Sequence, residues 1–553
     1  MTLAGSSLVS DGEAEERSFR GLWVGLGTLA SSVLLAVAHP PFSLGIVAPI
    51  VLVPWLRSLP AGGIVVGGLS GGALGLLFGM IVGSWVPEAL VVRGAGPVGA
   101  QVGWLVSALW AGAVPWMLLG AITGALLWLP PLPRILVGAL VAFALDFVRS
   151  VWLLGVPWAL LGHTQAAVLG VAQLAAIGGV PLISALIFGC NLGVAAALAT
   201  EPTEDCRARV YATACIGGWI GLALLGLPLA EATHRLVPIP ESVAAEPTRI
   251  LAVRRPVRYV DRWDDEAQSN QLSRLRTQTD RALAQIRGPR PEVVIWPENA
   301  ITTPLAEAPE LATALREAVA VLDTDVILGT VEREPTQEDA PAGGYRSALL
   351  WLSPSDGERD RFTKTVGVPV IEAEPTSRLE GWLRNRFGLP QGSRRLVPAS
   401  EERPLRGPFD LTVALCYEIV YPRRIAARRT EDTRAIVNAS SDAWLRDPAA
   451  ISAQLGAYGS FRAIEQRLSL LRISDAGRSN TLDRFGREQD AIPAGKSGWT
   501  LIETLPSRGP NPVEQAALGL LGVLAAGLAA IVGRIAWRRT EVEPSGTLRV
   551  SRR

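Results

Sequence analysis

Long apolar runs are the feature that most constrains how this chain can fold. An apolar run must cover roughly 17–25 residues to cross a bilayer as a helix. Long runs occupy 62–86, 101–129, 178–199, 210–231 and 513–533, and shorter or interrupted ones occupy 21–38, 43–57 and 134–153. The pattern predicts about seven membrane spans before residue 232 and one more near the C-terminus. For 43–57, a re-entrant or interfacial segment is the alternative.

A long polar stretch, 232–512, separates the apolar runs and holds most of the charge. It is long enough to form a domain of its own. The expected organisation is a cytoplasmic N-terminal arm (1–20), a membrane domain (21–231), a catalytic domain (232–512), a final span (513–534) and a cytoplasmic tail (535–553).

Arginines in the short loops predict the orientation of the chain, because loops rich in Lys and Arg stay in the cytoplasm. The predicted outer loops hold little charge beyond Arg93. This places 232–512 on the outer side of the membrane. The cytoplasmic loops and tail carry Arg57, Arg134, Arg207, Arg209, Arg534, Arg538 and Arg539.

The overall composition argues against several classes of function. The chain has 52 Lys and Arg against 51 Asp and Glu, so its net charge of +1 gives no support for a nucleic-acid partner. No His, Cys and carboxylate pattern has the spacing of a metal site. Neither lysine, Lys364 or Lys496, follows the glycine pattern of a phosphate-binding loop. We therefore expect no metal and no cofactor.

Cys416 is the only cysteine in the polar stretch. The three histidines, His39, His163 and His234, are all distant from it in sequence. A nucleophilic Cys416 would therefore need a carboxylate or a lysine as its partner instead of an imidazole. A buried structural thiol is the alternative interpretation.

Strand-like and helix-like segments alternate in the polar stretch, which favours an α/β sheet with helices outside. Glu298 comes shortly after the buried run 293–296, and Cys416 comes directly after the run 411–415. Lys364 comes after the run 345–352 and a charged turn. Reacting groups collect beyond the carboxyl ends of strands in such sheets. Glu298 would take the thiol proton, Cys416 would attack a carbonyl and Lys364 would stabilise the oxyanion.

Five ordered motifs, together with the predicted spans, resemble the apolipoprotein N-acyltransferase family of the nitrilase superfamily. The similarity covers roughly 21–535. The chain departs from the family pattern in four places. Tyr345-Arg346-Ser347 replaces Tyr-Asn-Thr, and Ile371 precedes Glu372 where glycine is usual. Ser441-Asp442-Ala443-Trp444-Leu445 replaces Asn-Asp-Ala-Trp-Phe, and Arg254-Arg255-Pro256 follows the first strand in place of a polar-amide motif. The motifs are Ile295-Trp296-Pro297-Glu298, Lys364 with Val368-Pro369 and Glu372, Cys416-Tyr417-Glu418, Ser441-Asp442-Ala443-Trp444 and Arg462-Ala463-Ile464-Glu465.

The resemblance implies an α-helical multi-pass membrane domain joined to an αββα sandwich. It implies a Glu298, Lys364 and Cys416 triad, supported by Glu372, Tyr417 and Glu418. The implied reaction moves an acyl chain from a phospholipid, typically phosphatidylethanolamine, through a Cys416 thioester. The implied acceptor is the α-amine of a diacylglyceryl-cysteine on an apolipoprotein. The implied location is the bacterial inner membrane, with the catalytic domain in the periplasm.

Two other functions remain open from the sequence. A membrane-tethered hydrolase would use the same triad with water as acceptor, although a soluble substrate gives no reason for so many spans. A non-catalytic membrane scaffold that binds lipoproteins or partner enzymes is the second alternative.

Overall fold

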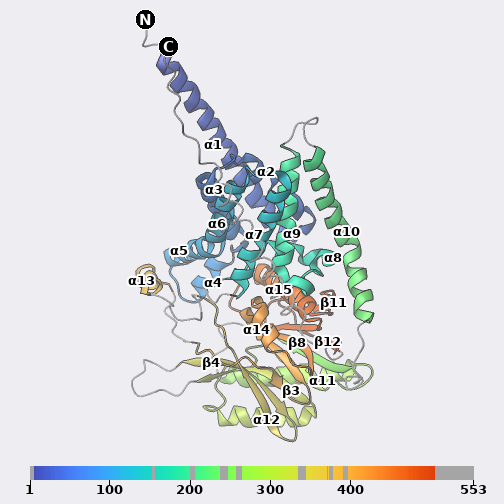
Figure 1. Cartoon of the computed structure of the whole chain (residues 1–553). Coiled ribbons are helices and arrows are strands. Elements are labelled where there is room, and N and C mark those ends of the chain that lie inside the picture. Colours follow the sequence, from blue (N-terminus) through green and yellow to red (C-terminus); the bar gives the residue numbers. More distant parts are fainter. Residues whose placement is uncertain are drawn as a thin grey trace, which may run out of the picture.

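The computed structural model describes residues 5–151, 156–199, 206–236, 247–256, 265–333, 344–369, 372, 378–389 and 396–504. A helical half packs on a β-rich half, and α10 (Cys206–Leu236) runs down one side of the helical half toward the β-rich one (Figure 1). The expected final span, 513–534, and the tail after it lie outside the described residues. So does Ile371.

Six segments of the helical half are long and apolar enough to cross a membrane: Phe19–Ala38, Ile64–Val82, Pro97–Leu126, Pro131–Val151, Ala175–Ala197 and Arg207–Arg235. The run at 43–57 instead forms a short 3-10 helix, Gly45–Ile50, and α2, Val53–Ser58. Pro49 and Pro54 lie within these two pieces. Proline lacks the amide hydrogen that a continuous helix needs, which accounts for the break.

Two membrane-half helices approach each other through glycines. They are α3 (Ile64–Val82) and α6 (Val114–Leu126). A Cβ on Gly67 would lie 2.3 Å from the carbonyl oxygen of Gly120, and one on Gly120 would lie 2.1 Å from that of Gly67. Small residues let helices pack this closely where lipid provides no hydrophobic drive for association.

The remaining membrane-half helices complete the frame around the site. They are α1 (Gly5–Ala38), α4 (Val86–Val92), α5 (Pro97–Ala108), a π-helical turn (Leu109–Ala113), α7 (Pro131–Val151), a 3-10 helix (Leu161–Ala167), α8 (Leu169–Ala172) and α9 (Ala175–Ala197).

The β-rich half contains two six-stranded sheets. The first has the order β12-β1-β2-β3-β4-β5 and the second β11-β10-β9-β8-β7-β6. Three parallel strands form the middle of each, β1-β2-β3 and β9-β8-β7, and antiparallel strands flank them. The first sheet comprises β1 (Thr248–Arg254), β2 (Val293–Ile295), β3 (Asp325–Arg333), β4 (Tyr345–Ser353), β5 (Gly357–Thr363) and β12 (Gly498–Thr504). The second comprises β6 (Leu405–Arg406), β7 (Asp410–Leu415), β8 (Thr433–Ser440), β9 (Leu470–Ser474), β10 (Ser479–Leu482) and β11 (Glu488–Ile492).

The two sheets pack face to face with helices on both outer faces, so the predicted αββα sandwich is confirmed. Residues such as Ile295, Val413 and Ile473 form the core between the sheets. On the outer face of the first sheet, α11 (Asp265–Gln285) and α12 (Pro309–Leu322) cover Val294 and Leu328. The outer face of the second sheet packs on α15 (Ala449–Gln466) and α14 (Pro422–Ala427).

The second sheet's helical layer also docks onto the membrane half. Phe461 and Ile464 of α15 belong to the hydrophobic core of the membrane half. Leu90 and Ala95, at the turn between α4 and α5, share a second core with Tyr417 and Trp444. One side of the sandwich therefore faces the membrane-spanning helices, and the other faces away from them (Figure 1).

Candidate active site

Lys364 is the centre of the polar cluster that the structure assembles. It follows the last residue of β5, and its side chain is 1% exposed. Its Nζ donates to Oε1 of Glu298 over 3.1 Å and to Oε2 of Glu372 over 3.0 Å. Burial disfavours the ammonium, but the two carboxylates outweigh it and hold the pKa of Lys364 well above its ordinary value. Lys364 is therefore a fixed positive charge.

Glu298 lies just beyond the end of β2, as the sequence predicts for the carboxyl end of a parallel strand. Its Oε1 also accepts a hydrogen bond from the hydroxyl of Ser347, at a position where the chain departs from the family pattern. The backbone of Glu298 packs against Gly329 of β3, where a Cβ would lie only 1.7 Å from the Glu298 carbonyl oxygen. Gly329 is therefore required for this approach of the two chains.

Neighbouring groups shift the pKa of Glu298 in opposite directions. Burial raises its pKa, Lys364 lowers it, and the neighbouring Glu372 raises it, leaving the pKa above the ordinary glutamate value. A carboxylate with a raised pKa is a stronger proton acceptor. Glu372 differs, because Lys364, Arg93 and the amide of Val368 outweigh its burial and lower its pKa. The two acids that hold Lys364 therefore differ in basicity.

Cys416 follows the last residue of β7 with a positive φ of 49°. A non-glycine residue in this region is strained and persists only where its surroundings fix it. Asn438 of β8 supplies part of that constraint. Its Nδ2 donates to the carbonyl oxygens of Cys416 over 3.1 Å and Ala414 over 2.9 Å.

The Cys416 thiol lies within the electrostatic influence of both other predicted catalytic residues. Burial and then the charge of Glu298 raise its pKa, Lys364 acts in the opposite direction, and the resulting pKa is about 12. The resting sulfur is therefore a thiol, and its proton must move to a base before the sulfur can attack. The structure thus brings Glu298, Lys364 and Cys416 together from the ends of three strands in two sheets.

Glu418 connects the Cys416 turn to the segment after Lys364. Its Oε1 accepts hydrogen bonds from the amides of Thr365 over 2.7 Å and Val366 over 3.1 Å, and its Oε2 accepts one from Leu415 over 2.9 Å. Arg428 donates to both oxygens. Burial works against its charge, but Arg428 outweighs burial and lowers the pKa of Glu418. Glu418 is a fully buried, positioning carboxylate.

Tyr417 joins the active site to an aromatic contact with the membrane half. Its ring stacks on Trp158 with centroids 5.9 Å apart and planes 15° apart. Trp158 also packs edge-on against Tyr458 of α15 and near Trp85, which in turn contacts Trp444. The aromatic surface beside Cys416 is therefore built from both halves of the chain.

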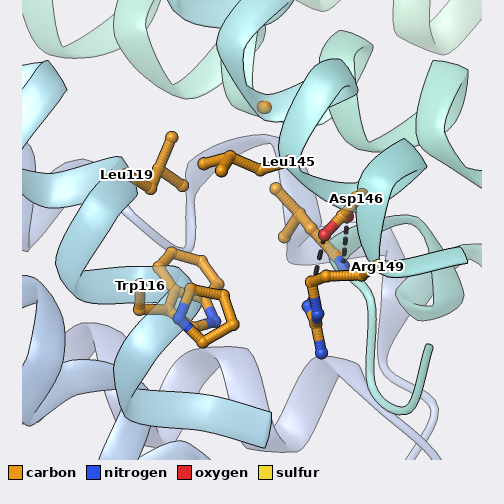
Figure 2. Close-up of a pocket in the computed structure, with 8 residues that line it drawn as sticks. Trp116, Leu119, Leu145, Asp146 and Arg149 are labelled. Atoms are coloured by element: carbon orange, nitrogen blue, oxygen red, sulfur yellow. Dashed lines mark hydrogen bonds and ion pairs between the residues drawn. The ribbon is translucent and has the colours of Figure 1, made fainter. Parts of the chain in front are cut away.

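A separate small hollow of about 20 Å³ lies within the membrane half (Figure 2). Figure 2 shows Asp146 and Arg149 paired at its edge, next to Leu145, with Trp116 across from them. Arg149 also donates to the carbonyl oxygens of Val156 and Trp158. The pair thereby holds the loop that carries Trp158. The lining of the hollow includes none of the predicted catalytic residues.

Arg428 and Asn438 are site-supporting residues that sequence reasoning missed. Arg428 lies among several arginines after Tyr421, and no local signal distinguishes it from them. Asn438 lies inside a buried strand, where only its polarity among apolar neighbours singles it out. Within the described ranges, no three His, Cys, Asp or Glu side chains are grouped as a metal ion would require.

Comparison with known proteins points to the same family that the motifs indicate. The family model described as the Apolipoprotein N-acyltransferase N-terminal domain matches residues 31–193. The resemblance predicted from the motifs is confirmed. Proteins named apolipoprotein N-acyltransferase are 26% identical in Pseudomonas paraeruginosa, over 53% of this chain and 55% of that protein, and 24% identical in Vibrio cholerae, over 62% and 63%. A third, from Rhizobium rhizogenes, is 29% identical over 43% of this chain and 45% of its own length. The alignments thus span about half of these curated relatives.

Solved structures were also matched. One is Nit3 of Saccharomyces cerevisiae, a member of branch 10 of the nitrilase superfamily, with 13% identity, a TM-score of 0.36, and coverage of 48% of this chain and 92% of that one. Another is an amidase from Nesterenkonia sp., with 13% identity, a TM-score of 0.33, and coverage of 47% and 91%.

Proposed function

We propose that this protein is a membrane-bound acyltransferase that moves an acyl chain from a phospholipid, through a Cys416 thioester, to the N-terminal amine of a diacylated apolipoprotein. Phosphatidylethanolamine is the proposed donor. The catalytic half would lie on the periplasmic side of the bacterial inner membrane. The observation that carries the proposal is the convergence of Glu298, Lys364 and Cys416 beside an aromatic contact with the membrane-spanning helices.

In the first half-reaction, the Glu298 carboxylate takes the proton from the Cys416 sulfur, which attacks the ester carbonyl carbon of the phospholipid. The carbonyl oxygen gains negative charge, and the Lys364 ammonium stabilises it. The carbon–oxygen bond of the ester then breaks, and the departing lysophospholipid oxygen collects the proton from Glu298. A thioester and a lysophospholipid result.

In the second half-reaction, the acceptor amine attacks the thioester carbonyl and gives its proton to Glu298. The carbon–sulfur bond breaks, an amide forms, and the Cys416 sulfur recovers a proton. Closure of the site against water favours this outcome over hydrolysis. Cys416 is 5% exposed and Lys364 1%, which fits a site that excludes water.

The proposal is tested with purified protein, phosphatidylethanolamine carrying a labelled acyl chain, and detergent micelles. Protein-bound label that neutral hydroxylamine removes is the expected result, because hydroxylamine cleaves thioesters. Cys416→Ser should lose that label. Cys215→Ser, a thiol of the membrane half, is the matched control and should keep it. Label that persists in Cys416→Ser would contradict the thioester.

The transferase and the hydrolase are separated by the product. A diacylated lipopeptide added to the labelled enzyme should yield a triacylated peptide. Release of free fatty acid instead would identify a hydrolase. Lys364→Arg should slow both half-reactions by about 100-fold, because the bulkier guanidinium cannot occupy the buried position between Glu298 and Glu372.

A further inference from the structure

Arg93 lies at the point where the membrane half meets the catalytic cluster. It is the first residue after α4, on the turn that leads into α5. Its neighbours Leu90 and Ala95 pack in the same core as Tyr417 and Trp444. The turn therefore brings a positive charge from the membrane-spanning half to the edge of the active site.

The guanidinium of Arg93 packs on an aromatic ring and forms no ion pair within the described residues. Its central carbon lies 6.0 Å from the centroid of the Trp444 ring, a cation–π distance. Its Nε is buried and has no hydrogen-bond partner in the described part of the chain. Most arginines around the site differ: Arg428, for example, is bound to Glu418 and Glu402.

Arg93 is not simply the counter-ion of Glu372. The charge of Arg93 contributes to the lowered pKa of Glu372, so the two groups are near each other. Glu372 nevertheless receives its hydrogen bonds from Lys364 and from the amide of Val368. No hydrogen bond joins Arg93 to Glu372 among the described residues. The donors of Arg93 therefore remain available to an anion from outside the chain.

We propose that Arg93 binds the phosphate of the phospholipid donor. This inference rests on the proposed acyl transfer and specifies how that site selects its donor. A guanidinium presents two parallel N–H groups that match the oxygens of a phosphodiester. In a phospholipid the phosphate is joined to the ester oxygens through glycerol. A phosphate on Arg93 would therefore orient the ester toward Lys364 and Cys416 from the membrane side.

Recognition of phosphate and a purely structural role predict different donor dependence. Acyl-enzyme formation is measured with two donors of the same chain length in the same micelles: phosphatidylethanolamine and the phosphate-free 4-nitrophenyl ester. Arg93→Gln should raise KM for the phospholipid about tenfold or more, the cost of one charged hydrogen-bonded contact. It should change KM for the nitrophenyl ester less than twofold. The KM of Arg93→Lys for the phospholipid should lie between those of wild type and Arg93→Gln, because lysine keeps the charge but lacks the two parallel N–H groups.

Arg57→Gln is the control, because Arg57 is an exposed arginine on α2, at the far end of the membrane half (Figure 1). It should match wild type with both donors. Equal loss by Arg93→Gln on both donors, or no loss on either, would overturn the role in phosphate binding while leaving acyl transfer intact. Wild-type enzyme labelled by the nitrophenyl ester but not by the phospholipid would instead overturn the proposed donor, and this inference with it.

Discussion

At the scale of single residues, the site depends on a strained cysteine and on the groups that hold its backbone. Asn438 donates to the carbonyl of Cys416, and Arg472 donates to Oδ1 of Asn438. Arg472 in turn is paired with Asp442 over 2.8 Å. Arg472 and Asp442 therefore fix the orientation of the Asn438 amide, and the amide in turn fixes the peptide that carries the nucleophile.

Asn438→Asp should slow acylation of Cys416 strongly. A carboxylate cannot donate to the carbonyls of Cys416 and Ala414, so two hydrogen bonds of about 1 kcal/mol each are lost, which corresponds to roughly 30-fold in rate. Single-turnover labelling measures the effect, and the melting temperature checks that the fold persists. A wild-type acylation rate in this variant would show that the Cys416 backbone is held by other contacts.

Activity should fall on the acid side with a midpoint above the ordinary glutamate pKa of about 4.3. Burial raises the pKa of Glu298, with Lys364 opposing and Glu372 reinforcing the shift. Below that raised pKa, Glu298 is protonated and cannot accept the thiol proton. A pH profile of single-turnover acylation measures the midpoint.

Glu372→Gln provides the matched test of that assignment. It removes a negative charge that raises the pKa of Glu298, so the acid limb should move to lower pH. A limb that stays in place would assign the titration to another group.

At the scale of elements, one carboxylate joins three segments. Glu418 binds the end of β7 and the residues after β5, while Arg428, next to α14, neutralises it. Both partners are fully buried, and Arg428 is also paired with Glu402. Removal of the Glu418 charge takes one of two carboxylates from Arg428 and an acceptor from three buried amides, at a cost of about 1–3 kcal/mol.

Glu418→Gln should therefore lower the melting temperature and also reduce acylation, since Lys364 and Cys416 are positioned by this residue. The pKa of Glu418 is lowered in the fold, so the stability it contributes is present above its unfolded pKa and is lost as the pH falls through the folded value. The difference in melting temperature between wild type and Glu418→Gln should shrink toward low pH. An unchanged difference would contradict the assignment.

At the scale of the whole molecule, the two halves are joined by a buried polar contact as well as by apolar packing. Gln454 of α15 donates to the carbonyl oxygens of Pro40 and Val82, and it accepts from the indole of Trp85. Pro40 follows α1, and Val82 and Trp85 lie at the turn between α3 and α4. The contact fixes the sandwich over the helices that present Arg93 and Trp158.

Gln454→Ala should destabilise the docking of the two halves. Buried backbone carbonyls would lose their donor, at a cost of about 1–3 kcal/mol. Limited proteolysis should cut the variant faster than wild type, and donor KM should rise. Gln285→Ala, at the exposed end of α11, is the control and should behave as wild type. Unaltered proteolysis of Gln454→Ala would place the docking energy in the apolar contacts.

Local patterns were sufficient for most elements of the sandwich. The runs at 293–296, 345–352 and 411–415 that the sequence analysis uses all form strands, as β2, β4 and β7. Continuous apolar runs bounded by turn residues identify buried strands, since both faces of a sandwich sheet are covered. The run at 43–57 shows where hydropathy is insufficient, because hydropathy does not register the proline breaks.

By itself, the sequence determined the division into apolar helices and a polar α/β half, and it singled out Glu298, Lys364 and Cys416, because strand ends and rare residue types are local properties. Only the tertiary structure decided which groups surround them. The positive φ of Cys416, the support from Asn438, the Glu418–Arg428 clamp and the placement of Arg93 all depend on segments far apart in the chain. Such contacts arise from the packing of two sheets and a helical bundle, and no short stretch of sequence encodes them.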